Sequence, residues 1–173
     1  MAWTSKLLLL ACACILILST YAVYDLNGNS MDFSNRQMVL VVSDSMDGDE
    51  DRYEVDSFPA NTLVMIEHVP DNEVRFLRVG QILSYYDGPT LIHHRIIQVN
   101  DDSFYVKGDN GHSTDKVMFG DVNGVVVGTN SWIGDILSWL SNNFLLFLGV
   151  MFALSIVLIL CYVRSTRPER EVS

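Results

Sequence analysis

Three short stretches of this sequence carry side chains that could together cleave an amide bond. They supply two serines, two histidines and two aspartates, namely Ser43, Ser45, His93, His94, Asp109 and Asp115. A serine hydroxyl attacks a carbonyl only when a neighbouring base takes its proton, and a third group must hold that base in place. Histidine suits the base because its pKa lies near neutrality. The three stretches therefore indicate acyl-transfer chemistry.

The candidate base comes from four histidines, which are His68, His93, His94 and His112. Adjacent residues of a strand point to opposite faces, so His93 and His94 cannot both enter one site, which also argues against a two-histidine metal site. His94 shares its face with Ile92 and Ile96. Partial desolvation among aliphatic neighbours keeps an imidazole neutral, as a base must be. A packed core histidine is the alternative interpretation of such a face.

The two serines lie where a strand is expected to end. Positions 39–42 are all apolar and predict a buried strand, and Ser43 and Ser45 follow it. Positions 47–56 then hold six acidic residues in ten. Their start is similar to a calcium loop, but Arg52 stands where glycine is needed and Phe58 where glutamate is needed. We interpret this segment as a solvated acidic loop, and we expect neither a metal nor a cofactor.

Short apolar runs between turn signals predict a mostly β fold. We expect strands at 62–66, at 74–86 with a break at Gly80, and at 91–99, 103–106 and 122–128. Strands this short and this regularly punctuated favour a small antiparallel β domain at 38–130, with 109–115 as a loop. The polar residues 25–37 predict a linker before it.

Two apolar blocks without charges flank this domain. About 20 apolar residues cross a bilayer core, so we expect a transmembrane anchor at 1–24, uncleaved rather than a signal peptide, and a second transmembrane helix at 144–163. Positions 131–143 have helical periodicity and predict an amphipathic segment that lies at the membrane surface or caps the β core. Positions 164–173 form a short polar tail.

Charge predicts the orientation of the chain. Positions 25–143 hold seven Lys/Arg against 19 Asp/Glu, while Lys6, Arg164, Arg167 and Arg170 lie at the ends. The positive-inside rule predicts a two-pass cell-membrane protein with both termini in the cytoplasm and the β domain outside. The acidic domain is a poor candidate for nucleic-acid binding. It has no cysteine, which excludes disulfides and thiolate metal sites there.

In this order the motifs resemble signal peptidase I, specifically the archaeal and endoplasmic-reticulum type. That family has a Ser-Gly-Ser-Met box, an Ile-x-His-Arg box and a Lys-Gly-Asp-Asn box with a further aspartate. Here the boxes are Ser43-Asp44-Ser45-Met46, Ile92-His93-His94-Arg95, and Lys107-Gly108-Asp109-Asn110 with Asp115. Lesser matches are Val79-Gly80-Gln81-Ile82 and Val126-Val127-Gly128. The resemblance covers approximately positions 38–135 and implies a signal-peptidase-like β domain between the two transmembrane helices.

The resemblance also implies a function and residue roles. The chain would be a membrane-bound serine endopeptidase that removes signal peptides from exported preproteins after small residues, with the protein-export translocon as a candidate partner. Ser45 would be the nucleophile and His94 the general base. Asp115 would orient His94, with Asp109 as the competing candidate because Asp-Asn-Gly is also a simple turn. The backbone amide of Ser45 and the hydroxyl of Ser43 would bind the oxyanion.

Two departures from the family pattern favour a different interpretation. Asp44 stands where the family has glycine, although strand alternation points it away from Ser43 and Ser45. Gly48 and the acidic loop replace a proline-containing turn after Met46. Either change would suit an inactive relative. The alternative function is therefore a non-catalytic, membrane-anchored β interaction domain.

Overall fold

A computed structural model of the chain describes residues 30–166 together with Ala13 and Ile17. The chain divides into two compact units, residues 28–138 and residues 1–27 with 139–173. The anchor predicted at 1–24 lies outside the described residues, apart from Ala13 and Ile17, and so do residues 167–173 of the predicted tail.

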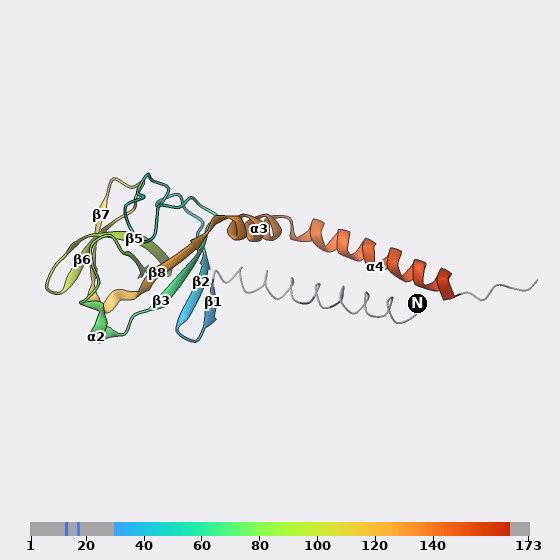
Figure 1. Cartoon of the computed structure of the whole chain (residues 1–173), viewed down its shortest axis with the longest axis horizontal. Helices are drawn as coiled ribbons and strands as arrows, with labels where there is room; N and C mark the ends of the chain where they lie inside the picture. Colours follow the sequence, from blue (N-terminus) through green and yellow to red (C-terminus); the bar gives the residue numbers. More distant parts are fainter. Residues whose placement is uncertain (1–12, 14–16, 18–29, 167–173) are drawn as a thin grey trace, which may run out of the picture. The chain divides into compact units, whose positions relative to one another are not determined.

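The unit at residues 28–138 is built on one antiparallel sheet of eight strands, in the order β1-β2-β3-β8-β4-β5-β6-β7 (Figure 1). The strands are β1 (Ser30–Phe33), β2 (Arg36–Leu40), β3 (Leu63–His68), β4 (Ile82–Asp87), β5 (Thr90–Val99), β6 (Ser103–Lys107), β7 (Thr114–Met118) and β8 (Val122–Asn130). Two short helical turns, α2 (Asp71–Val74) and η1 (Phe119–Asp121), join strands. The prediction of a mostly antiparallel β fold is confirmed.

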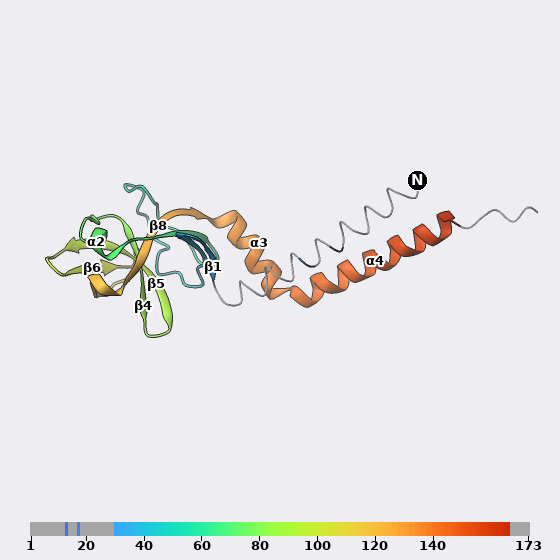
Figure 2. The same ribbon diagram turned by 90° about the horizontal axis from the view of Figure 1, so that it is seen from below.

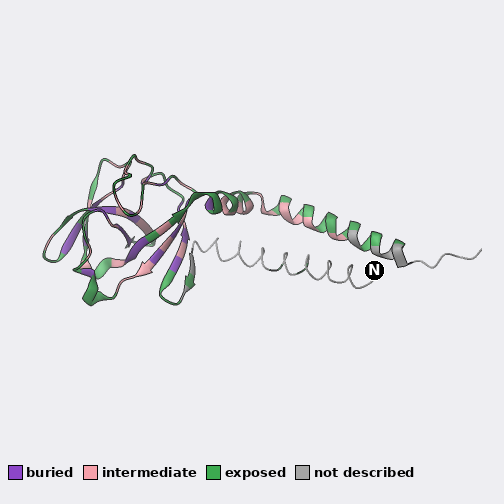
Figure 3. Cartoon of the chain, viewed as in Figure 1, coloured by how far each residue is buried: buried purple, intermediate pink, exposed green. Residues whose placement is uncertain are grey.

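Two apolar cores lie on opposite faces of this sheet. The first core contains Val39, Val41, Met46, Phe58, Val64, Ile66, Ile82 and Val126. The second core contains Val74, Leu83, Tyr85, Ile96, Phe104, Val106, Val117 and Val125. Neighbouring residues of β4 and β8 go to different cores, because adjacent side chains of a strand point to opposite faces. Figure 3 shows the buried residues concentrated along the strands.

Several predicted boundaries were wrong at the start of the domain. Residues 30–37, predicted as linker, form β1 and the start of β2, which are paired in a hairpin through Ser34 and Asn35. Ser34 has φ of 55°, a conformation that suits such a tight turn and gives no signal in an apolar pattern. The predicted strand at 39–42 begins earlier, at Arg36, and ends at Leu40. Val41 still exchanges backbone hydrogen bonds with Asn61 and Thr62.

Two further predictions were wrong in the middle of the chain. Residues 74–79 do not form a strand, because Pro70 starts the helical turn α2, which ends by burying Val74 in the second core. The segment 109–115 is a loop only up to Ser113, and Asp115 belongs to β7. Strand β7 has only one buried residue, Val117, so its sequence lacked the apolar alternation that predicts a strand.

Two helices follow the sheet. Helix α3 (Ser131–Asn142) coincides with the predicted amphipathic segment, and its Gly134 lies so close to the backbone of Asn61 and Leu63 that a Cβ there would clash. Helix α4 (Phe144–Thr166) starts at the predicted second span. Within the described part of the chain it alone is long and apolar enough to cross a bilayer, judged by length and composition.

Candidate active site

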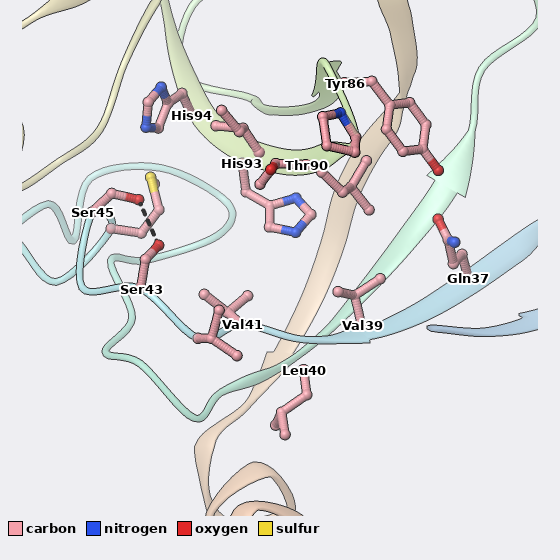
Figure 4. A pocket seen from close by; sticks show the side chains of 15 residues that line it. Gln37, Val39, Leu40, Val41, Ser43, Ser45, Tyr86, Thr90, His93 and His94 are labelled. Carbon is pink, nitrogen blue, oxygen red and sulfur yellow. Dashed lines mark hydrogen bonds between the residues drawn. The ribbon is translucent and has the colours of Figure 1, made fainter. Parts of the chain in front are cut away.

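Strand β5 carries the two histidines, one on each face. Ile92 and Ile96 on one side of the strand pack in or against the second core, and Leu91 on the other side packs against the first. By alternation His94 belongs to the second-core face and His93 to the first-core face. Both residues also line one groove, which lies between β5 and the segment that follows β2 (Figure 4).

His94 is held by two groups at its Nδ1 atom. The Asp115 carboxylate oxygen Oδ2 lies 3.2 Å from Nδ1. The Tyr85 hydroxyl lies 3.1 Å from Nδ1 and donates a hydrogen bond of 3.1 Å to Asp115 Oδ2. The Tyr85 and His94 rings meet edge to face, with their centroids 6.1 Å apart. With Nδ1 held in this way, Nε2 is the ring nitrogen left for chemistry.

Register brings these three side chains together. Asp115 pairs with Val106 on β6, which pairs in turn with Ile96 on β5, two residues from His94. Tyr85 pairs with Ile92, the residue two places before His94. Diagonal neighbours in a sheet are within reach of an aromatic side chain. The apolar residues of the second core therefore fix the strands that carry the acid, the phenol and the imidazole.

Ser45 lies in the turn that follows β2, on the side of the groove opposite β5. Its Oγ atom is 3.3 Å from the Oγ of Ser43 (Figure 4). Within the described part of the chain no hydrogen bond joins Ser45 Oγ to His94, and no group accepts a hydrogen bond from the Ser45 amide. Asp44 accepts a hydrogen bond from the Ala60 amide, 3.2 Å away, so its carboxylate turns from the two serines.

The loop at residues 108–111, called the glycine loop below, places His94 beside Ser45. A Cβ built on Gly108 would lie 2.5 Å from the Ser45 carbonyl oxygen and 3.2 Å from His94 Nε2. Any larger residue at position 108 would therefore push Ser45 and His94 apart. The next residues clamp the serine turn, since the Asn110 amide donates to the Ser45 carbonyl at 3.0 Å and its side chain to the Asp44 carbonyl at 3.3 Å.

Asp109 binds Arg95, whereas Asp115 contacts His94. Its carboxylate accepts two hydrogen bonds from the Arg95 guanidinium, at 2.8 and 2.5 Å, and one from Ser57 at 2.7 Å. Both charged side chains are only 3% exposed. Arg95 also donates to the carbonyls of Val55 and Gly80 and lies over the Tyr53 ring. The structure thus brings Asp115 to His94 and uses Asp109 to tie the glycine loop to β5.

The groove has a volume of about 530 Å³. Its walls come from the β2 segment and from the β4–β5 hairpin, whose exposed tip projects from the sheet in Figure 2. The lining residues are Gln37, Val39, Leu40, Val41, Val42, Ser43, Ser45, Met46, Tyr86, Pro89, Thr90, Leu91, Ile92, His93 and His94. The groove is therefore mostly apolar and has its reactive groups at one end.

Burial sets the protonation states in the site. It lowers the pKa of His94, while the Asp115 carboxylate acts in the opposite direction. It also lowers the pKa of His93, to about 4, and the neighbouring His94 adds to this shift. Burial and Asp115 both raise the pKa of the Tyr85 hydroxyl, which stays a donor. At neutral pH both imidazoles are therefore uncharged, and His94 is able to accept a proton.

Sequence reasoning missed the parts played by Tyr85 and Arg95. Tyr85 could have been found by counting outward from the turn at Gly88 and Pro89, because a two-residue turn pairs position 85 with 92. Arg95 offered no comparable signal, since its partner Asp109 depends on how the glycine loop folds back. No protein-family model matches the chain, and no curated protein or solved structure matches it either.

Proposed function

We propose that this chain is a serine hydrolase whose nucleophile is Ser45 and whose general base is His94. The observation that carries the proposal is the Asp115–His94 contact of 3.2 Å at the end of a groove that Ser45 also lines. A carboxylate at Nδ1 holds the tautomer in which Nε2 accepts a proton. More particularly, we propose a membrane-bound endopeptidase of the signal peptidase I type that cleaves preproteins after small residues.

The reaction would proceed by acyl transfer. Ser45 Oγ attacks the scissile carbonyl as its proton passes to Nε2 of His94, and a C–O bond forms. The imidazolium then gives that proton to the leaving amine, and the C–N bond breaks. Water, activated by the same imidazole, releases the acyl group from Ser45. Asp115 stabilises the imidazolium, while the Ser45 amide and the Ser43 hydroxyl would donate hydrogen bonds to the oxyanion.

The missing bond between Ser45 and His94 is compatible with this mechanism. Catalytic hydrogen bonds are often long without substrate and shorten only in the complex. Ser43 Oγ, 3.3 Å away, is the present partner of Ser45 Oγ. In the proposed mechanism, substrate binding would break the contact between Ser43 Oγ and Ser45 Oγ and bring Ser45 Oγ to Nε2 of His94.

The groove offers an extended substrate a strand edge. The β5–β6 ladder begins at Arg95, so residues 90–94 of β5 pair with β4 but with no second described strand. A peptide lying along this edge would make main-chain hydrogen bonds and place alternate side chains in the groove. Apolar walls such as Val39, Val41 and Leu91 would favour small uncharged side chains.

The helices that follow the domain support a membrane location. Trp132 and Trp139 on α3 are exposed, and tryptophan is enriched at membrane interfaces. Helix α4 has the length and composition of a span. A cell-membrane protein with two spans, cytoplasmic termini and an external β domain is the proposed topology, with signal peptides at the bilayer surface as substrates.

The decisive experiment uses the full chain in lipid vesicles with a radiolabelled preprotein. We expect cleavage at one site after a small residue, and we expect the Ser45→Ala variant to be inactive. The Thr129→Ala variant is a matched control because it removes an exposed hydroxyl of β8 that does not line the groove. Equal cleavage by Ser45→Ala and the unmodified chain would refute the mechanism.

A non-catalytic interaction domain is the second candidate. The observation in its favour is that Ser45 Oγ bonds to Ser43 and not to His94. This domain would bind preproteins in the groove without cutting them. Binding of a preprotein with no cleavage across pH 5–9 would favour it over the hydrolase.

A further inference from the structure

Among the described residues that line the groove, one buried side chain has an unpaired polar atom and takes no part in the proposed mechanism. His93 is 6% exposed, and its Nδ1 atom has no hydrogen-bond partner in the part of the chain that the structure describes. Most buried polar side-chain atoms in proteins are hydrogen-bonded, because an unpaired one loses the bonds it made to water. An apolar residue would fill this position at lower cost, so the unpaired imidazole calls for an explanation.

A second unpaired atom lies next to it. Ser84 on β4 is the register partner of His93, and its fully buried Oγ atom likewise has no hydrogen-bond partner among the described residues. Directly opposed residues of an antiparallel pair share a face and have Cβ atoms about 5 Å apart. On this face Ile82 and Leu91 are apolar neighbours of the pair, and the buried Arg95 beyond them is bound to Asp109. Unlike Arg95, the two polar groups are kept together beside apolar side chains without a described partner.

The His93 ring points into the groove. Figure 4 shows it between the β5 backbone and the side chains of Val39 and Val41, in the middle of the lining. Ser43 and Ser45 lie at one end of the lining, and Gln37 and Tyr86 lie at the other. An extended peptide that reaches Ser45 along the edge of β5 would pass over this ring.

We propose that His93 forms a polar subsite of the groove that selects substrates with a hydroxyl side chain, serine or threonine, one or three positions before the cut. The inference rests on the proposed endopeptidase function and adds a specificity to it. Side chains one and three places before the cut share a face of an extended strand, so either could meet the groove floor.

A hydroxyl suits this subsite better than a charged group. The low pKa of His93, which burial causes, leaves its imidazole neutral, so it provides no positive charge for a carboxylate. A charged side chain would also lose its hydration between Val39 and Val41. A neutral imidazole has one donor and one acceptor, and a hydroxyl can pair with the ring nitrogen that faces the groove, whichever of the two roles that nitrogen has. An alanine side chain would fit the space and leave the imidazole unpaired.

The test compares matched preproteins in the vesicle assay. Each pair differs only by serine against alanine, first at the position before the cut and then two residues earlier. For the unmodified chain we expect kcat/KM to favour serine about fivefold at one of these positions, the size of a typical net hydrogen bond. The His93→Leu variant should lose this preference, and His93→Gln, which keeps a donor and an acceptor, should retain part of it.

A third variant controls for a general effect of removing an imidazole. His68→Leu changes a histidine of β3 that bonds to the Asn123 carbonyl and does not line the groove, and it should keep the serine preference. An equal serine-to-alanine ratio in the unmodified chain and in His93→Leu would overturn the subsite and leave the endopeptidase intact. Absence of any cleavage by the unmodified chain would instead overturn the endopeptidase, and the subsite with it.

Discussion

The two faces of β5 give the neighbouring residues His93 and His94 different environments. On the second-core face His94 has two partners at Nδ1, and its side chain is still 13% exposed. On the first-core face His93 is more deeply buried, and its Nδ1 has no partner among the described residues. In the proposed hydrolase, the base needs a fixed tautomer and access to solvent, whereas the recognition group needs hydrogen-bonding capacity that the protein leaves unused. The same residue type would therefore take different roles because of its strand neighbours.

The largest expected effect separates the two histidines directly. The His94→Ala variant should lose about a thousandfold in kcat, because it removes the base that the proposed mechanism assigns to Ser45. His93→Leu should retain turnover on an alanine-containing preprotein within about tenfold, since its imidazole moves no proton in the proposed mechanism. Single-turnover cleavage by both variants, with circular dichroism to check folding, measures the difference. Comparable losses in both would remove the distinction between the faces.

The two aspartates should separate stability from catalysis. Asp109→Ala leaves the buried Arg95 guanidinium without its counter-charge, so the free energy of unfolding should fall by about 3–5 kcal/mol. The Asp115 side chain is 44% exposed, so the Asp115→Ala variant should have nearly unchanged stability and a strongly reduced kcat. Urea denaturation followed by near-ultraviolet circular dichroism, beside the cleavage assay, tests both. A stable but inactive Asp109→Ala variant would contradict these roles and would make Asp109 the residue that supports His94.

The buried His93 should make the fold sensitive to acid. Its folded pKa of about 4 lies below the ordinary 6.5, so between these values the unfolded chain binds a proton that the folded chain does not. Stability from this group is complete above pH 6.5 and falls as the pH drops, by about 3 kcal/mol at pH 4. His93→Leu should lack this part of the acid sensitivity. Denaturation of both proteins at pH 7 and pH 4.5 measures it, and identical pH dependence would contradict it.

The smallest expected effect concerns Tyr85. Removing its hydroxyl in Tyr85→Phe takes a donor from Asp115 and a contact from His94 Nδ1, so kcat should fall about fivefold with little change in KM. Tyr105→Phe, on the surface of β6, is the matched control and should have no effect. A change in KM alone would mean that Tyr85 acts on substrate binding and not on the orientation of His94.

Sequence patterns were informative where local signals are strong. The turn at Gly88 and Pro89, the apolar runs around it and the separate faces of His93 and His94 follow from period-two alternation and turn chemistry. Strand β7 could not be predicted in this way, because it has one buried residue and is defined by pairing with β6. Helical turn α2 was also missed, because a turn of four residues after Pro70 is too short to leave a helical period in the sequence.

By itself the sequence determined a mostly β domain, its acidic surface, an apolar helix after it and a set of serine, histidine and aspartate candidates. Only the tertiary structure decided which aspartate reaches His94, that Tyr85 joins them, and that Arg95 takes the other aspartate. These pairings depend on strand register and on the path of the loop at Gly108, which bring together residues 9 to 63 positions apart in the chain. Secondary-structure propensity depends only on residues that are close in the chain, so it cannot predict such contacts.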